Sequence, residues 1–254
     1  MKFQLVSDLH LEKYKKLPSF FKLIEPKAPN LILAGDICFA KHEHFVPFFQ
    51  QLSIHFIQIF FVLGNHEYFD RQYHYNSLGE IELIIKEQLE NIPNVTILQK
   101  NFKTLGSNIV IIGATLWSYL SQKYMIEPMT LLTETDFVLY KKKLLLHPKI
   151  TNVVHLKHKQ WLNDTLDSFE GKKIIVVTHY LPSKICIAKK YKYDTFNKAY
   201  YSNCDDLVKK ATVWCAGHTH ISTTKKIGNT PIYINSCGYL WETNQYKTDF
   251  VFEV

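Results

Sequence analysis

Five short apolar segments, each followed at once by polar side chains, constrain the fold of this chain most strongly. They span residues 1–7, 31–34, 57–63, 174–178 and 211–215. Each is a near-continuous apolar run, as in strands that are buried on both faces of a sheet covered by helices. In open α/β sheets of this kind, ligands bind at the carboxyl ends of the strands. The sequence therefore predicts a layered α/β fold with a functional site along one sheet edge.

The polar residues that follow these segments form five motifs. They are Asp8-Leu9-His10, Gly35-Asp36, Gly64-Asn65-His66-Glu67, His179, and Gly217-His218-Thr219-His220. Carboxylate, amide and imidazole groups without a thiolate suit divalent Mn, Fe, Zn, Co or Ni. A mixed set of this kind is typical of a catalytic rather than a structural metal site. We therefore interpret the five motifs as parts of one metal site.

The spacing of the motifs supports this interpretation. Asp8 and His10 are two residues apart, as are His218 and His220, so in an extended segment each pair points to one side. The first three motifs are separated by about one strand plus one crossover helix, which brings them to neighbouring strand ends. The glycines at positions 35, 64 and 217 adjoin these residues, where we expect tight backbone turns.

In this order, the five motifs resemble those of the calcineurin-like metallophosphoesterase superfamily. The segments Gly113–Ser118 and Asn235–Tyr239 are also similar to segments of its small, single-domain, bacterial-type members. The resemblance implies a β-sandwich of two mixed sheets flanked by helices. No repeat or Gly/Ser-rich linker interrupts the sequence, and we expect a single domain over residues 1–254.

The resemblance also implies a binuclear centre and a reaction. One divalent metal would be held by Asp8, His10 and His220, and the other by Asn65, His179 and His218, with Asp36 bridging them. A hydroxide between the two metals would attack the phosphorus of a phosphoester. His66 would protonate the leaving oxygen or stabilise phosphoryl charge, and Glu67 would orient His66. The catalytic residues so implied are Asp36, His66 and Glu67.

The chain departs from one branch of this superfamily. Ser/Thr protein phosphatases continue the Gly-Asp motif with acidic and arginine residues, whereas here the continuation is Ile37-Cys38-Phe39-Ala40. Arg71 is the only arginine, and lysine does not reproduce its bidentate grip on phosphate. We therefore favour a phosphomonoesterase or phosphodiesterase that acts on a small or nucleotide-like substrate. A nuclease or protein phosphatase, and a non-catalytic scaffold, are the alternatives.

The charge and the aromatic residues bear on these alternatives. A net charge of +7 permits anionic partners without specifying one. A nuclease needs a basic groove with interleaved aromatic residues, and the segment 189–193 is the one short tract of that kind. The long segment 181–202 leaves a metal-bearing strand end, so we expect a wall or lid of the pocket whose lysines attract phosphate. A surface crossover is the alternative interpretation of this segment.

Other residues carry weaker expectations. Five cysteines without a Cys-x-x-Cys pair indicate a reducing, cytoplasmic setting, and no apolar stretch is long enough to span a membrane. For histidines outside the motifs we expect surface or capping roles, and for the four tryptophans core positions. Tyr180 and Tyr239 either line the pocket or pack. Helices are predicted over 45–52, 77–89, 155–169 and 203–210, and further strands near 95–98, 108–112, 231–234 and 249–253.

Overall fold

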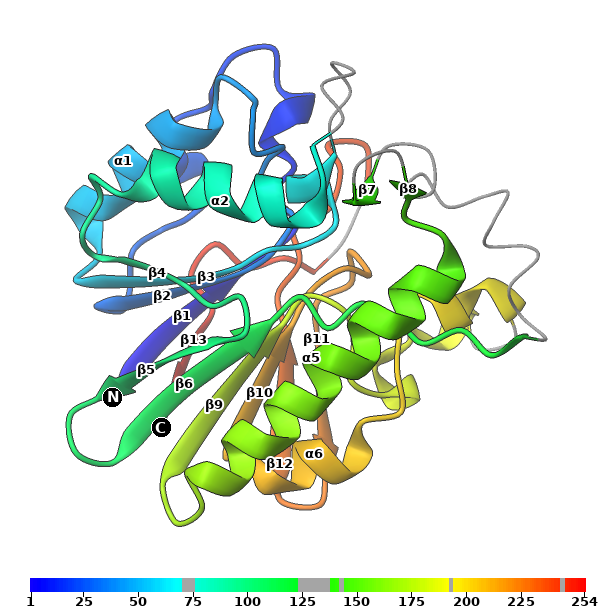
Figure 1. Cartoon of the computed structure of the whole chain (residues 1–254). Helices are drawn as coiled ribbons and strands as arrows, with labels where there is room; N and C mark the ends of the chain where they lie inside the picture. Colours follow the sequence, from blue (N-terminus) through cyan, green and yellow to red (C-terminus); the bar gives the residue numbers. More distant parts are fainter. Residues whose placement is uncertain (70–75, 123–137, 142–143, 192–193, 243–244) are drawn as a thin grey trace.

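Two β-sheets face each other across a shared apolar layer (Figure 1). The computed structural model describes residues 1–69, 76–122, 138–141, 144–191, 194–242 and 245–254. In the first sheet the strand order is β13 (Val251–Glu253), β1 (Lys2–Val6), β2 (Asn30–Ala34), β3 (Gln58–Val62) and β4 (Val95–Ile97). In the second it is β11 (Thr223–Ile227), β12 (Thr230–Ile234), β10 (Val213–Ala216), β9 (Lys173–Thr178), β6 (Ile109–Ala114) and β5 (Asn101–Leu105).

Both sheets are mixed, as predicted. Strands β1 to β4 run parallel, and β13 joins β1 antiparallel. In the second sheet β6, β9, β10 and β12 run parallel, with antiparallel β5 and β11 at the two edges. A separate hairpin consists of β7 (Leu139–Lys141) and β8 (Leu144–Leu145). The five predicted motif strands are therefore β1, β2, β3, β9 and β10, all of them among the parallel strands of the two sheets.

Helices cover the outer face of each sheet (Figure 1). The first sheet carries α1 (Phe45–His55) and α2 (Leu78–Leu89), and the second carries α5 (Pro148–Ser168) and α6 (Asp205–Lys210). Strand β2 shows why both faces are apolar: Leu31 and Leu33 belong to the helix-covered core, whereas Ile32 and Ala34 belong to the layer between the sheets. Among the described residues, no helix has both the length and the apolar character that crossing a membrane requires.

Several predicted elements need correction. The third helix begins at Pro148 rather than near residue 155, because Pro148 occupies its first turn and the His147 ring accepts a hydrogen bond from the Lys149 N–H. The last helix begins after Cys204, not Asn203. Between β1 and β2 the chain forms only two short 3-10 helices, η1 (Leu11–Lys13) and η2 (Phe20–Lys22), instead of a crossover α-helix.

The expected surface or capping roles of the non-motif histidines hold for some residues and are wrong for others. His147 caps a helix and His55 is exposed, but His44, His155 and His158 are buried. Each of these three bonds to a backbone group, which compensates for its burial. His74 lies outside the described residues. Among the tryptophans, Trp117 and Trp214 are core residues, Trp161 is half-buried and Trp241 is 71% exposed, so the core prediction is wrong for Trp241.

His155 and His158 fix a strained turn that follows β6. Leu116 and Trp117 both have positive φ, at 74° and 49°. The Leu116 N–H donates to His158 Nδ1 at 3.1 Å, and the Leu116 carbonyl accepts from His155 Nδ1 at 3.0 Å. Two rings of α5 therefore bond to the same residue, Leu116. His158 accepts from its N–H through an unprotonated Nδ1, whereas His155 donates to its carbonyl through a protonated Nδ1, so the two rings are opposite tautomers.

This arrangement predicts an acid-sensitive fold. Burial, together with the charge of Lys100, lowers the pKa of His158 to about 3. The unfolded chain protonates this ring near its ordinary pKa of 6.5, so the stabilising contribution is complete above pH 6.5 and is lost as the pH falls towards 3. When the pH falls from 6.5 to 5.5, the free energy of unfolding measured in urea should decrease by about 1 kcal/mol less in His158→Asn than in wild type. An unchanged pH dependence in this variant would contradict the assignment.

Candidate metal centre

The five motifs meet at the carboxyl ends of β1, β2, β3, β9 and β10, as the sequence predicts. The backbone there is unusual. Asp8, His10, Asp36, His218 and His220 all have positive φ, between 47° and 74°. Residues with a Cβ rarely adopt this left-handed conformation, and it concentrates at functional sites. The positive φ values turn these side chains out of the strand direction and towards one another.

Glycines allow the motif loops to touch. A Cβ on Gly217 would lie 2.8 Å from both Asp8 Oδ2 and Ser7 Oγ, closer than real Cβ contacts occur. A Cβ on Gly64 would overlap Asp36 Oδ1, and Gly35 combines a φ of +86° with a similarly close approach to the His179 ring. The predicted tight turn is therefore confirmed at Gly35, whereas at Gly64 and Gly217 the structure shows close approach of neighbouring loops, which excludes a Cβ.

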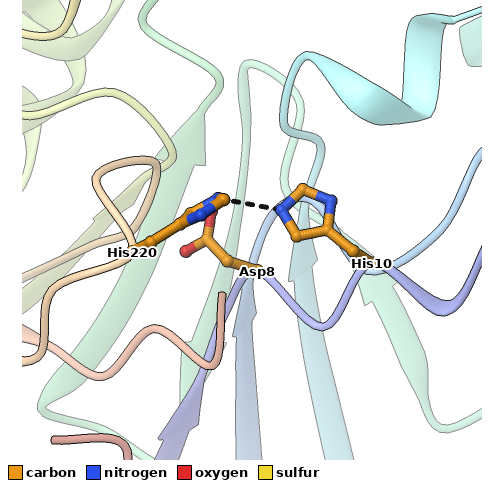
Figure 2. Close-up of side chains that lie close together, drawn as sticks. All are labelled: Asp8, His10 and His220. Atoms are coloured by element: carbon orange, nitrogen blue, oxygen red, sulfur yellow. Dashed lines mark hydrogen bonds and ion pairs between the residues drawn. The ribbon is translucent and has the colours of Figure 1, made fainter. Parts of the chain in front are cut away.

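The first cluster consists of Asp8, His10 and His220 (Figure 2). His10 Nε2 lies 2.9 Å from His220 Nε2, and Asp8 Oδ1 lies 3.8 Å from the same His220 nitrogen. The opposite ring nitrogens face carboxylates: His220 Nδ1 lies 2.7 Å from Glu242, and His10 Nδ1 lies 3.3 Å from Glu12. Carboxylates only accept hydrogen bonds, so both Nδ1 atoms carry protons. In the neutral rings two Nε2 lone pairs then converge beside a carboxylate, which fits a divalent cation.

The second cluster consists of Asp36, His179 and His218, with Asn65 beside it. His179 Nε2 lies 2.9 Å from Asn65 Oδ1 and 3.3 Å from Asp36 Oδ2. The His179 Nδ1–H donates to the Ala34 carbonyl at 2.8 Å, which leaves Nε2 to face the cluster. Asp36 Oδ2 is also 4.0 Å from His10 Nε2, so this carboxylate lies between the two clusters.

The pKa shifts agree with a site that needs positive charge. Burial alone would raise the pKa of Asp36, but His179, His66 and His10 outweigh it and hold that pKa well below its usual value. Burial would lower the pKa of His179, but the Asp36 carboxylate raises it to about 9. Buried carboxylates require such compensation, and bound cations supply it where protons do not.

Glu67 holds the backbone of the site, and the prediction that it orients His66 is not what the structure shows. Its Oε2 accepts the N–H groups of Gly64 at 2.6 Å and Asp36 at 2.9 Å. Its Oε1 accepts those of Ile37 at 2.7 Å and Cys38 at 3.3 Å. One buried carboxylate therefore joins the loop after β2 to the loop after β3.

The carboxylate that contacts the His66 ring is Glu12, which the sequence analysis missed. Glu12 Oε1 lies 2.9 Å from His66 Nδ1. On the other side of the ring, His66 Nε2 lies 3.4 Å from the Tyr239 hydroxyl and 4.0 Å from Asp36 Oδ2. Burial would raise the pKa of Glu12, but its hydrogen bonds to His10 and His66 lower it to about 2. The alternation of Asp8, His10 and Glu12 was the sequence signal for this residue.

A cavity of about 360 Å³ opens beside the two clusters. On one side it is lined by residues of the clusters and by Tyr239, on the other by the segment 187–200. This confirms the predicted wall, which includes the short 3-10 helices η6 (Lys189–Tyr191) and η7 (Thr195–Ala199) and follows a third, η5 (Lys184–Cys186). Its side chains at the cavity include Ile187, Tyr191, Phe196 and Tyr200. Tyr180 packs instead on the His218 ring, with 4.0 Å between centroids.

The described lysines of this wall do not line the cavity, so their predicted attraction of phosphate stays a prediction. No lysine is among the described residues that line the cavity. Lys189 is exposed, and Lys198 bonds to the Tyr201 hydroxyl at 2.6 Å, beside a different cavity. The Lys190 side chain and the whole of Lys192 lie outside the described part of the chain. The wall is therefore mainly aromatic and aliphatic where it is described.

Known proteins support the assignment of the fold. A protein of Acanthamoeba polyphaga mimivirus, described as uncharacterized protein L509, is 27% identical over 95% of this chain and 92% of its own length. The phosphopantetheinyl hydrolase of Mycobacterium tuberculosis superimposes with a TM-score of 0.75 at 18% identity, covering 94% of this chain and 89% of that one. A dimetal phosphatase from Danio rerio gives a TM-score of 0.51 at 13% identity, covering 92% and 86%.

A family model decides the classification. The model of the calcineurin-like phosphoesterases matches residues 1–222, which include all five motifs and most of both sheets. The match agrees with the mixed two-sheet sandwich and with the His/Asp clusters at the strand ends. The chain therefore belongs to the calcineurin-like phosphoesterase family.

Proposed function

We propose that this protein is a hydrolase of phosphoesters that works with two divalent cations. The observation that carries the proposal is the pair of Nε2 atoms of His10 and His220, 2.9 Å apart beside Asp8, with a second cluster next to it. Asp8, His10 and His220 would hold one cation, Asn65, His179 and His218 the other, and Asp36 both. Bound there, divalent cations lower the pKa of water and neutralise phosphoryl charge.

The remaining chemistry falls to side chains that face the cavity. His66 Nε2 points towards Asp36 Oδ2 and the Tyr239 hydroxyl, and its ring stacks on Phe69 with 4.5 Å between centroids. In this position His66 protonates the leaving oxygen or stabilises the phosphoryl charge. Glu67 serves this reaction indirectly, because its carboxylate holds the backbone N–H of Asp36.

The cavity favours a small or nucleotide-like substrate over a macromolecule. Its volume of about 360 Å³ is within the range of small-ligand pockets. Polynucleotides need a positively charged groove, whereas the described lining contains no lysine and includes Asp194 and Glu242. A phosphopantetheinyl group, which appears in the name of the mycobacterial neighbour, is one candidate for the organic part of the substrate that faces the aromatic wall. The five free cysteines agree with a reducing, cytoplasmic setting, which we propose for this protein. We also propose that residues 1–254 form one domain.

A substrate panel tests this proposal. Chelated protein is reloaded separately with Mn, Ni, Co, Zn and Mg, then assayed on phosphomonoesters, phosphodiesters, nucleotides and a phosphopantetheinyl diester. We expect metal-dependent hydrolysis of one small-substrate class, with Mn among the supporting metals. No hydrolysis under any metal would favour the scaffold alternative, and selective cleavage of polynucleotides would favour a nuclease.

Replacing the carboxylate between the clusters should remove metal and activity together. Asp36→Ala deletes the carboxylate whose Oδ2 lies 3.3 Å from His179 Nε2 and 4.0 Å from His10 Nε2, so we expect fewer than two bound metals per chain and no measurable hydrolysis. Elemental analysis after gel filtration measures the metal content. Asp206→Ala, which changes an exposed carboxylate on α6, is the control. Two tightly bound metals in Asp36→Ala would show that the bridging role is wrong.

Replacing His66 should instead separate metal binding from catalysis. We expect His66→Gln to keep its metal content while kcat falls by about 10²–10⁴-fold, the usual loss for a general acid or base. The decrease should be smaller for a p-nitrophenyl ester, because that leaving group needs no proton. The exposed His55 provides the matched control, His55→Gln. Loss of metal on the scale of Asp36→Ala would make His66 a ligand.

The aromatic wall should set affinity for the organic part of the substrate. Phe196 lines the cavity and contacts the ring of Tyr200, whereas Lys198 lies beside the other cavity. Phe196→Ala should raise KM about tenfold for bulky esters and much less for small ones, with metal content unchanged. Lys198→Ala and Lys189→Ala should leave both KM values near those of wild type. A KM that rises only in the lysine variants would restore the basic-lid interpretation.

A further inference from the structure

Glu12 occupies an unusual position between two histidines of the site. Its side chain is 2% exposed, and it belongs to η1, the short 3-10 helix that follows His10. One oxygen, Oε1, lies 2.9 Å from His66 Nδ1 and 3.3 Å from His10 Nδ1. The other oxygen, Oε2, is buried and has no hydrogen-bond partner among the described residues. The contacts of this carboxylate are therefore concentrated on two imidazoles.

The geometry on the far side of each ring shows the consequence. His10 Nε2 faces His220 Nε2 at 2.9 Å, and His66 Nε2 faces the Tyr239 hydroxyl at 3.4 Å. Both Nε2 atoms lie 4.0 Å from Asp36 Oδ2. Because a carboxylate only accepts hydrogen bonds, both Nδ1 atoms must be donors. Both rings then present Nε2 to the cavity: His10 presents a lone pair, whereas His66 presents an N–H in the imidazolium that acts as the acid and a lone pair once that proton has been transferred.

No other described contact performs this function for His66. The acidic residue that protein phosphatases carry after the Gly-Asp motif is absent, since Ile37 to Ala40 follow Asp36 here. Glu67 is engaged by backbone N–H groups. Phe69 and Phe39 pack near the His66 ring, at centroid distances of 4.5 and 5.6 Å, but they do not distinguish one ring nitrogen from the other.

From this geometry we infer that Glu12 is a positioning residue that fixes the tautomer and ring orientation of both His66 and the metal-ligand candidate His10. The inference rests on the proposed function for the role of His66, but the hydrogen bonds themselves do not depend on it. Without Glu12, the His66 ring loses the described acceptor of its Nδ1–H, at 2.9 Å, and with it the hydrogen bond that selects one ring orientation. The same change loosens His10, so one residue couples metal binding to leaving-group chemistry.

Glu242 provides a matched comparison. Its Oε2 lies 2.7 Å from His220 Nδ1 and accepts the Tyr239 N–H, so it orients a ligand candidate but contacts neither His10 nor His66 through any described hydrogen bond. Its side chain is 35% exposed. Loss of a carboxylate behind a metal-bound histidine typically costs 10–100-fold in metal affinity or activity. Glu242→Ala should therefore show only a lower affinity for metal, and excess metal should restore its activity.

The direct test is imidazole NMR on full-length, Zn²⁺-loaded protein, whose ions are diamagnetic. Long-range ¹H–¹⁵N spectra identify the tautomer of each ring, and the His66→Gln variant assigns the His66 signals. At a pH where the rings are neutral, we expect Nδ1–H tautomers for His10 and His66 in wild type. Glu12→Gln keeps an acceptor oxygen and should retain them, whereas Glu12→Ala should give a mixture or the Nε2–H form at His66. An unchanged His66 tautomer in Glu12→Ala overturns the inference.

Kinetics at saturating metal provide an independent readout. Glu12→Ala should lower hydrolysis of an alkyl phosphoester by about 10–100-fold and of its p-nitrophenyl analogue by clearly less, with Glu12→Gln between it and wild type. Glu242→Ala should leave the ratio of the two substrates unchanged. An equal loss on both substrates in Glu12→Ala overturns the inference. So does one fewer bound metal per chain in Glu12→Gln, because Glu12 would then be a ligand. If wild type hydrolyses no ester, the proposed function fails while the tautomer measurement still decides this inference.

Discussion

The Glu67 carboxylate, buried among four backbone N–H groups, is the interaction on which the site depends. It joins the loop of Asp36 to the loop of Gly64, and so sets how the ends of β2 and β3 approach. Burial raises the pKa of Glu67 to about 7, and the charge of Asp36 adds to the rise. Two carboxylates in one buried region each oppose ionisation of the other. A cation beside Asp36 offsets that repulsion, so binding of metal and integrity of the loops are linked.

The motif loops also hold one another in a conformation that isolated loops would avoid. The left-handed backbone of a non-glycine residue costs about 1 kcal/mol or more, and five ligand candidates adopt it. Hydrogen bonds between the loops compensate for this cost. The Asp8 N–H donates to the Gly35 carbonyl, the His10 N–H donates to the Asp36 carbonyl, and the Asp8 carboxylate accepts the His218 N–H. The parallel strands place these loops side by side, and the loops then fix the side chains.

The parts that the sequence predicts well are those set by burial. A strand such as β2, apolar at every position after Asn30, has few alternatives, and the polar residues that follow it must lie at the sheet edge. The edge strands β5 and β11 escaped prediction because their side chains are mostly exposed or half-exposed. Glu12 and Glu67 both lie beside ligand candidates in the sequence, but only the fold of the short 3-10 helices η1 and η3 (His66–Tyr68) brings Glu12 to two imidazoles and Glu67 to backbone N–H groups. His155 and His158 were misjudged because their partners belong to an irregular turn at Leu116.

The acceptors behind the imidazoles explain how the site is organised from outside inwards. The Ala34 carbonyl holds His179, Glu242 holds His220, and Glu12 holds His10 and His66, each through Nδ1. Every Nε2 of these rings is thereby directed at the clusters or the cavity. The strand ends supply this polar half, whereas the segment 187–200 supplies the apolar half. Substitutions in that segment can therefore change substrate preference while the metal-ligand candidates stay in place. Tyr200 is the exception, because its ring packs against the His218 ring with 4.9 Å between centroids and so connects the two halves.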